Sequence, residues 1–76
     1  MGAENVEITW QDRFRKEYEE LKGRYNKLHK MLVKYKAGTL DFTPNCSFEL
    51  LSEQAAAMGK YLFILETRAE IEKIVL

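Results

Sequence analysis

The residues with the clearest chemistry are a basic and aromatic cluster near the start of the chain and one arginine far from it. Arg13, Arg15 and Lys16 lie close to Trp10, and Arg68 falls within an otherwise apolar stretch. An arginine fork binds phosphate and an aromatic ring stacks on a base, so these residue types suit a small anion that carries a ring system. The competing interpretation is ion pairing of the basic cluster with acidic residues near Arg68.

A second candidate anion site lies in the middle of the chain. Phe42 and Asn45 are close to Lys34 and Lys36, just before the start of a predicted helix, where backbone amides attract anions. Tyr61, on the same apolar stretch as Arg68, completes the set of candidate binding residues.

The sequence contains none of the residue sets that usually carry catalysis or hold a metal. It has no nucleophile with a base and an orienting group, no paired-carboxylate site and no glycine-rich phosphate loop. His29 has no metal ligand at suitable spacing, and Cys46, the single cysteine, lies near a helix start without an evident base. We therefore expect a capping or packing role for Cys46, and a protein that is no enzyme and uses no metal or cofactor.

Length and charge exclude several classes of partner. The chain has 76 residues and is one domain at most. A domain this small buries only about 60% of its unfolded surface. Twelve basic and twelve acidic residues give a net charge of zero, which argues against binding DNA, an RNA polymer or an anionic membrane.

No segment of the sequence resembles a membrane span or a targeting signal. The longest apolar run, YLFIL, is too short to cross a bilayer, and the N-terminus does not resemble a secretory signal. The sequence predicts a soluble, intracellular protein.

Apolar residues in the first half of the chain repeat with a helical period. Thr9 followed by Asp12 is typical of a helix start, and Gly38 is typical of a helix end. Between them the spacing alternates between four and three residues, which is a heptad pattern. The positions of this first stripe are Phe14, Tyr18, Leu21, Tyr25, Leu28, Leu32 and Tyr35. The pattern predicts a helix over residues 10–36, after a flexible or extended segment over residues 1–9.

The second half predicts a loop followed by another helix. Pro44 cannot lie inside a helix, so residues 37–46 should reverse the chain. A helix over 47–73 should follow, with a stripe formed by Leu51, Ala55, Met58, Leu62, Leu65 and Ala69. The segments VEI and IVL could each form a short strand or pack as an apolar flap. The predicted fold is all-α, an antiparallel two-helix hairpin forming one domain over residues 10–76.

The second predicted helix carries more apolar surface than one neighbouring helix can cover. Beside the stripe described above lies another, formed by Leu50, Gln54, Ala57, Tyr61, Ile64, Arg68 and Ile71. Apolar surface beyond a single stripe must be buried by something else. The small residues Ala55, Ala56, Ala57 and Gly59 would let another backbone approach closely. The hairpin is thus predicted to assemble into a homo-oligomeric helical bundle.

The ordered segments FRKEYEELKGRYNKLHKMLVKY, AGTLDFTPNC and FELLSEQAAAMGKYLFILETRAEIE resemble a group of small phage proteins that share a helical-hairpin domain. The resemblance covers roughly residues 10–73. This family includes the sponges that counter bacterial CBASS and Thoeris immunity by sequestering nucleotide signals.

The resemblance implies a compact homo-oligomer, often a hexamer, that holds cyclic dinucleotides, cyclic trinucleotides or cyclic ADP-ribose isomers between protomers without cleaving them. Its aromatic-plus-arginine pattern transfers to Arg68 and then to the basic cluster of the first helix. The implied protein is phage-encoded, acts in the host bacterial cytoplasm and sequesters a small nucleotide messenger. The alternative from the residues is a protein-binding phage inhibitor or small assembly protein that uses the apolar face of the second helix.

Overall fold

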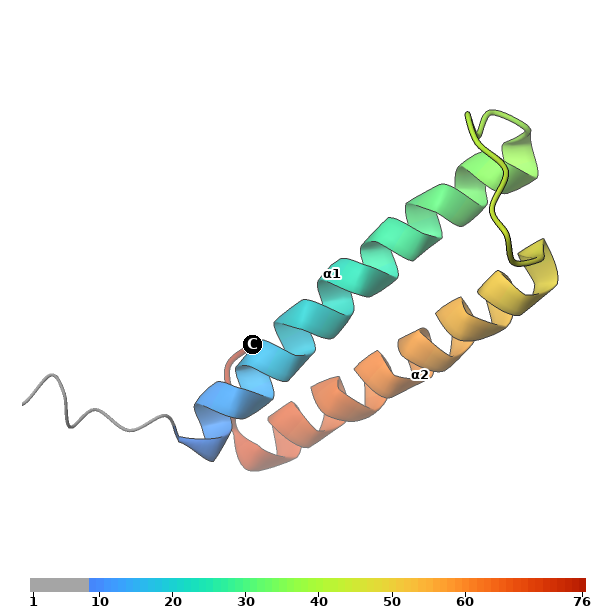
Figure 1. Ribbon diagram of the computed structural model, residues 1–76. Coiled ribbons are helices and arrows are strands. Elements are labelled where there is room, and N and C mark those ends of the chain that lie inside the picture. Colours follow the sequence, from blue (N-terminus) through green and yellow to red (C-terminus); the bar gives the residue numbers. More distant parts are fainter. Residues whose placement is uncertain (1–8) are drawn as a thin grey trace, which may run out of the picture.

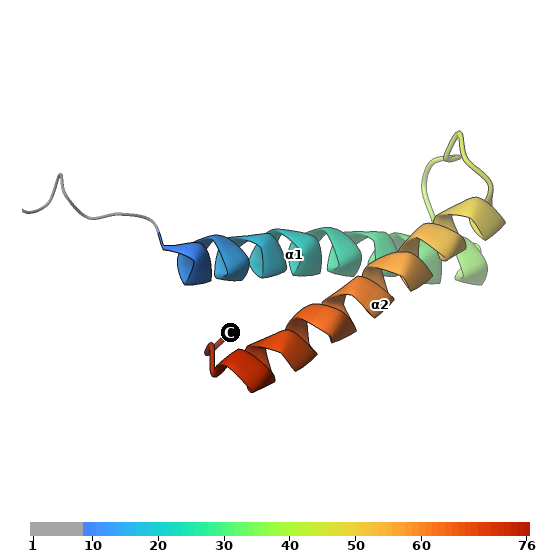
Figure 2. The same cartoon turned by 90° about the horizontal axis from the view of Figure 1, so that it is seen from below.

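Two long helices make up the fold. The computed structural model describes residues 9–76, in which α1 (Trp10–Ala37) and α2 (Phe48–Glu72) are joined by a loop over residues 38–47. The helices run antiparallel (Figure 1), and the second view shows α2 inclined across α1 (Figure 2). The part of the chain that the structure describes contains no strand. The prediction of an all-α fold with two helices is confirmed.

Local hydrogen bonds fix both ends of α1. The Thr9 hydroxyl accepts a hydrogen bond from the Asp12 amide at 3.1 Å, and the Asp12 carboxylate accepts one from the Thr9 amide at 3.3 Å. This reciprocal pair is a capping box, which satisfies two amides that would otherwise lack partners. At the other end, Gly38 adopts the left-handed conformation (φ 80°) and donates to the carbonyls of Lys34 and Tyr35. The ends of α1 therefore follow from the short motifs that predicted them.

The start of α2 is capped by Ser47, whose hydroxyl accepts a hydrogen bond from the Leu50 amide at 3.1 Å. Cys46 is exposed, so the capping or packing role expected for it is wrong. The neighbouring serine takes that role because its hydroxyl is a better acceptor than a thiol.

The stripe of α1 that begins at Phe14 and the stripe of α2 that begins at Leu51 face each other and form the core. Every position of both stripes is buried or half-buried. The tightest cluster is Phe14, Leu65, Ala69 and Ile74, in which Leu65 is only 1% exposed. Gly59 belongs to this interface, so its predicted role in the approach of a second subunit is wrong. A Cβ at Gly59 would lie 3.5 Å from the Tyr25 ring, so the missing side chain makes room for that ring.

The C-terminal tail folds back onto the hairpin. Lys73 ends α2 with a left-handed conformation (φ 58°), and Ile74 then turns into the core while its amide donates to the Ala69 carbonyl at 2.9 Å. The tail ends beside the first turns of α1 (Figure 1). Within IVL only Ile74 packs against the core, because Val75 is 80% exposed and Leu76 46%, so the expected apolar flap is reduced to one side chain. The segment VEI and the predicted N-terminal segment up to residue 8 lie outside the described residues.

Two glycines offer opposite stability effects from the same substitution. Gly38 has a φ of 80°. Gly38→Ala should lower the free energy of unfolding by about 1 to about 2 kcal/mol, because an L-residue is strained in the left-handed region. Gly23→Ala, in the middle of α1, should raise it by about 1 kcal/mol, because alanine loses less entropy in a helix. A Cβ would meet no atom within 4 Å at either position, so backbone conformation alone distinguishes them. Urea denaturation of both variants followed by circular dichroism measures the difference, and shifts of equal sign would contradict it.

Candidate functional site

An arginine and two aromatic rings meet at the open end of the hairpin, where α1 begins and α2 ends. The rings of Trp10 and Phe14 pack edge to face, with centroids 6.5 Å apart and planes at 90°. The guanidinium carbon of Arg68 lies 4.9 Å from the Phe14 ring centroid, within the range of a cation–π contact. We call Trp10, Phe14 and Arg68 the open-end cluster. Because Phe14 is only 5% exposed, packing holds the ring on which Arg68 rests.

Arg68 keeps much of its hydrogen-bonding capacity for another partner. Its Nε lies 3.4 Å from Glu72 Oε2 one helical turn later, and half of its side chain is exposed. An exposed ion pair of this kind contributes only about 0 to about 1 kcal/mol. The guanidinium has five N–H donors, and the contact with Glu72 uses the one on Nε. A phosphate could therefore replace or join Glu72 at small cost.

Arg15 serves the C-terminal tail of its own chain. Its Nε donates to the Val75 carbonyl at 2.9 Å, and its Nη1 contacts Asp12 Oδ1 at 3.3 Å. The tail runs along the flank of the hairpin that also holds Glu66 and Glu70. Successive residues of an α-helix are rotated by about 100° around its axis. Glu66 and Glu70 are each two residues from Arg68, so they lie on the opposite side of α2. The structure thus assigns Arg15 and Arg68 to different flanks.

A cavity of about 700 Å³ lies on the flank of the tail. Its lining includes Tyr18, Glu66, Glu70 and Lys73, together with residues 74–76. The Tyr18 hydroxyl donates to Glu66 Oε2 at 2.7 Å, joining the two helices. Two carboxylates against one ammonium group do not favour phosphate. Size alone therefore does not make this cavity the anion site.

The bond between Tyr18 and Glu66 predicts an alkaline loss of stability. The hydrogen bond to Glu66, then burial and the nearby negative charge, raises the pKa of Tyr18 above 10.0. A raised pKa in the folded state stabilises the hairpin fully below about pH 10, and this stabilisation is lost as the pH rises through the folded value. Tyr18→Phe should lower the free energy of unfolding by about 1 kcal/mol at about pH 8 and flatten its decline above about pH 10. Urea denaturation at a series of pH values measures both, and an unchanged alkaline slope in the variant would contradict the assignment.

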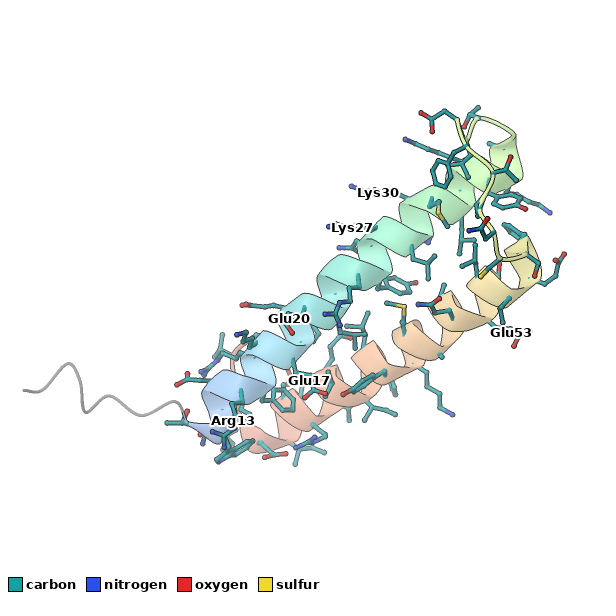
Figure 3. The ribbon with its side chains drawn as sticks, viewed as in Figure 1. Arg13, Glu17, Glu20, Lys27, Lys30 and Glu53 are labelled. Carbon is teal, nitrogen blue, oxygen red and sulfur yellow. The ribbon has the colours of Figure 1, made fainter. Side chains whose placement is uncertain are left out.

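Arg13 and Lys16 line a charged groove on α1. This cavity of about 430 Å³ also involves Asp12, Glu17 and Glu20. Figure 3 shows Arg13, Glu17 and Glu20 along this helix, with Lys27 and Lys30 further on. Three carboxylates against two cations make the groove a mixed surface. It suits a polyanion poorly, in agreement with the net charge of the chain.

The candidate residues of the loop lie at the far end of the molecule, whose longest dimension is 54 Å. Phe42 is 56% exposed and lines a small pocket of about 200 Å³ with Tyr35, Leu40 and Pro44, among others. Asn45 is exposed as well. The lining of this pocket contains no charged side chain, so it suits an apolar or aromatic group. One hairpin does not bring this pocket to the open-end cluster.

Tyr61 lies on the additional apolar stripe of α2, and the structure leaves that stripe uncovered. Tyr61 is 43% exposed, Ile64 45%, Leu50 54% and Ile71 73%. Arg68 belongs to the same stripe, so the open-end cluster and this uncovered surface adjoin each other. Any partner that covers the stripe will also reach Arg68.

Sequence reasoning misses two parts of this arrangement. It does not count Phe14 among the candidate binding residues, although Phe14 is the ring beneath Arg68. It also misses the pair of Tyr18 and Glu66. The register of the two helices is the signal that could have found both, because it sets each residue of α1 opposite a definite residue of α2.

Two further findings concern residues 9–76. None of their histidine, cysteine, aspartate and glutamate side chains form a group of three or more that could hold a metal ion. Neither helix combines the length and apolar character needed to cross a membrane.

The comparisons with known proteins identify a family. No curated protein and no solved structure is significantly similar to the chain. A family model described as Sequestin matches residues 8–71, which is most of the chain, and this confirms the family resemblance found in the sequence. The name indicates sequestration of a molecule, and therefore binding in preference to catalysis. The chain belongs to the Sequestin family.

Proposed function

We propose that this protein is a phage-encoded sponge that sequesters a small cyclic nucleotide or a cyclic ADP-ribose-type immune signal in the host bacterial cytoplasm and does not cleave it. The observation that carries the proposal is the stacking of Arg68 on Phe14 beside Trp10. A guanidinium held on a ring, with half of its side chain exposed, is a ready site for phosphate. Family membership supports sequestration.

The open-end cluster provides the two kinds of contact that a nucleotide needs. The terminal nitrogens of Arg68 can donate two parallel hydrogen bonds to one phosphate. Trp10 is 43% exposed, and its indole offers a face on which a base can stack. The mixed charges on α1 around Arg13 and Lys16 limit the length of anion that can bind. This combination favours a small messenger over a nucleic-acid polymer.

The proposed pocket lies between copies of the chain. Small-molecule sites are usually concave and bury most of the ligand, whereas Arg68 and Trp10 lie on an exposed flank of one hairpin. The uncovered stripe that includes Tyr61 and Ile64 adjoins them. A second subunit on this stripe would supply the missing wall. The proposal therefore includes a homo-oligomer, for which the family resemblance suggests a hexamer.

Isothermal titration calorimetry of the assembled protein tests the proposal. The ligand panel comprises cyclic dinucleotides, cyclic trinucleotides and cyclic ADP-ribose isomers, with linear AMP as a control. We expect saturable heat for at least one cyclic ligand, and mass spectrometry should recover that ligand intact after incubation. The absence of heat for every ligand at tens of micromolar protein would refute the proposal.

The exposed apolar surface also favours a second candidate, a protein-binding phage inhibitor or small assembly protein. Phe63 is 66% exposed and Ile71 is 73% exposed. Large apolar side chains this exposed often mark a surface that binds a partner. A partner helix could dock along α2 with these residues as anchors. A pull-down from infected cells that returns a stoichiometric protein partner, with a monomeric chain in isolation, would favour this function over the sponge.

A further inference from the structure

The basic residues of the chain are concentrated in one part of α1. Half of the twelve lie within residues 22–36, a stretch without any acidic residue, whereas all twelve acidic residues lie elsewhere in the chain. These six are Lys22, Arg24, Lys27, Lys30, Lys34 and Lys36. The net charge of zero therefore hides a strongly basic region in the half of α1 that adjoins the loop.

The hairpin itself does not balance these charges. Within residues 9–76, none of the six basic residues takes part in an ion pair. Lys30 lies three residues after Lys27 and four before Lys34, and like charges at these spacings are neighbours on a helix and repel each other. Figure 3 shows Lys27 and Lys30 on the side of α1 that faces away from α2. A negatively charged partner would relieve this repulsion.

An apolar groove lies inside the basic region. It has a volume of about 390 Å³ and lies between the last turns of α1 and the start of α2. Its lining consists of His29, Leu32, Val33, Lys36, Ala37 and Phe48. Val33 is 54% exposed, so much of this aliphatic side chain has no partner within the hairpin. Lys36 Nζ lies 5.6 Å from the Phe48 ring centroid, which places a cation at the border of the apolar surface.

Basic side chains flank the groove on both sides. Three residues correspond to about 300° around a helix, which is about 60° short of a full turn. Lys30 is three residues before Val33 and Lys36 is three after it, so the two lysines lie about 60° to either side of Val33. Protein interfaces commonly combine an apolar centre with a polar rim. The groove has this arrangement, and its rim carries charge of one sign.

We propose that this groove binds an acidic amphipathic helix of another protein. An apolar side chain of that helix packs on Val33 and Phe48, and its carboxylates pair with Lys30 and Lys36. A helix laid into an apolar groove is a common mode of peptide recognition. A nucleic acid fits less well, because a base stacks on an open ring face, whereas Phe48 already contacts Lys36 and Tyr35.

This surface is separate from the candidate nucleotide site. Phe48 and Glu66 are eighteen residues apart, which is five full turns of an α-helix, so the groove lies on the flank of α2 that holds Glu66. Arg68 and the uncovered stripe of α2 lie on the opposite flank. The proposed helix binding therefore does not rest on the sponge function, and a bound nucleotide would not block the groove.

Fluorescence anisotropy with a labelled synthetic peptide tests the proposal on the full-length chain. The probe is an acidic helix of glutamate, leucine and alanine, with its leucines on one face. A scrambled peptide of the same composition tests whether charge alone is sufficient, and a peptide with lysine in place of glutamate tests apolar contact alone. At about 150 mM salt, which screens distant charges, we expect the probe to bind at least about tenfold more tightly than either control. Equal affinity for the probe and the scrambled peptide would overturn the proposal.

Two pairs of variants locate the bound peptide. Val33→Asn should weaken binding about tenfold, because it places a polar group in the apolar contact. Ile71→Asn, on the uncovered stripe of α2, should leave binding unchanged. Lys36→Ala should weaken binding up to about fivefold through loss of an ion pair. Lys27→Ala removes the same charge about 120° away from Val33 around α1, so its effect should be less than about twofold.

Each outcome supports or overturns the groove as the site, once circular dichroism has shown that the variants are helical. A loss of binding in Ile71→Asn but not in Val33→Asn would place the peptide on α2 and overturn the proposal. Equal losses in Lys27→Ala and Lys36→Ala would show undirected attraction and overturn it as well. The same result would follow if a labelled uridine oligomer or phosphatidylglycerol vesicles bound more tightly than the peptide.

Calorimetry with the nucleotide panel on Val33→Asn separates this inference from the sponge function. The variant should lose the peptide and keep the nucleotide heat of the unmodified chain. Peptide binding by a chain that gives no nucleotide heat would refute only the sponge. Loss of nucleotide heat together with peptide binding in Val33→Asn would show that the groove belongs to the nucleotide site, and would overturn the separate surface proposed for a protein partner.

Discussion

Replacing Leu65 with alanine should remove much of the stability of the hairpin. Leu65 is the most deeply buried large side chain among the described residues, and it packs with Phe14, Ala69 and Ile74. A buried leucine truncated to alanine usually costs about 2 to about 5 kcal/mol, from lost burial and from the cavity that remains. Domains of this size have a total stability of roughly 4 to roughly 11 kcal/mol. We therefore expect a large fall in the urea midpoint, measured by circular dichroism.

Val33→Ala is the matched control for Leu65→Ala. Val33 is also aliphatic and helical, but it is 54% exposed. Its truncation should therefore change the free energy of unfolding by no more than about 0.5 kcal/mol. Both variants should be measured at several protein concentrations, because assembly adds to apparent stability. Equal losses in the two variants would show that burial within the hairpin does not determine its stability.

The helices could be predicted because their signals are local. Thr9 and Asp12 are three residues apart, and Gly38 acts within a single turn, so short motifs set both ends of α1. The two heptad stripes also follow from spacing alone, and the positions they select are those that the structure buries. A hairpin is the simplest way for two such stripes to cover each other when the loop between them is short.

The contacts that depend on the register of α1 against α2 could not be predicted from local signals. The bond between Tyr18 and Glu66 joins residues 48 positions apart, and that from Arg15 to Val75 spans 60. The bond from Arg15 to Val75 also depends on the left-handed conformation of Lys73, which turns the tail back. A lysine gives no indication of that conformation in the sequence, because L-residues other than glycine, asparagine and aspartate rarely adopt it. The misassignment of Gly59 has a related cause, since a small residue admits either a neighbouring ring or another backbone. Only the packed helices show that the ring of Tyr25 fills this space.

The candidate site was predicted in part. Arg68 stood out because a charge on an apolar stripe needs a partner, and the structure gives it both Phe14 and Glu72. Charge and residue type alone could not distinguish it from Arg15, which is bound to the tail. Phe42 and Asn45 shared the same residue-type signal but lie at the opposite end of the hairpin. Of the eight residues that the sequence offers as candidate binding residues, the structure therefore brings Trp10 and Arg68 together at one end of the hairpin. Tyr61 lies on the adjoining stripe.

Arg68→Ala should weaken nucleotide binding by about a hundredfold while the assembly remains intact. A hydrogen bond to a charged group contributes about 1.5 to about 3 kcal/mol, and a bidentate phosphate contact loses its charge and its geometry together. The structural cost should be small, because the exposed pair with Glu72 contributes at most about 1 kcal/mol. Calorimetry measures the affinity, and analytical ultracentrifugation measures the mass of the assembly.

Arg68→Lys separates the role of the charge from that of the guanidinium. Lysine keeps the positive charge but lacks the planar fork that binds phosphate and stacks on Phe14, so we expect an intermediate loss of about tenfold. Lys30→Ala, on the outer side of α1, removes one positive charge far from the cluster and should leave the affinity unchanged (Figure 3).

The outcomes for Arg68→Ala decide the role of this residue. If the substitution dissociates the assembly, the arginine is structural. If the variant binds nucleotide as tightly as the unmodified chain, the ligand lies elsewhere. Loss of binding in an intact assembly, with an intermediate loss for Arg68→Lys, is the result that a direct contact between Arg68 and the ligand predicts.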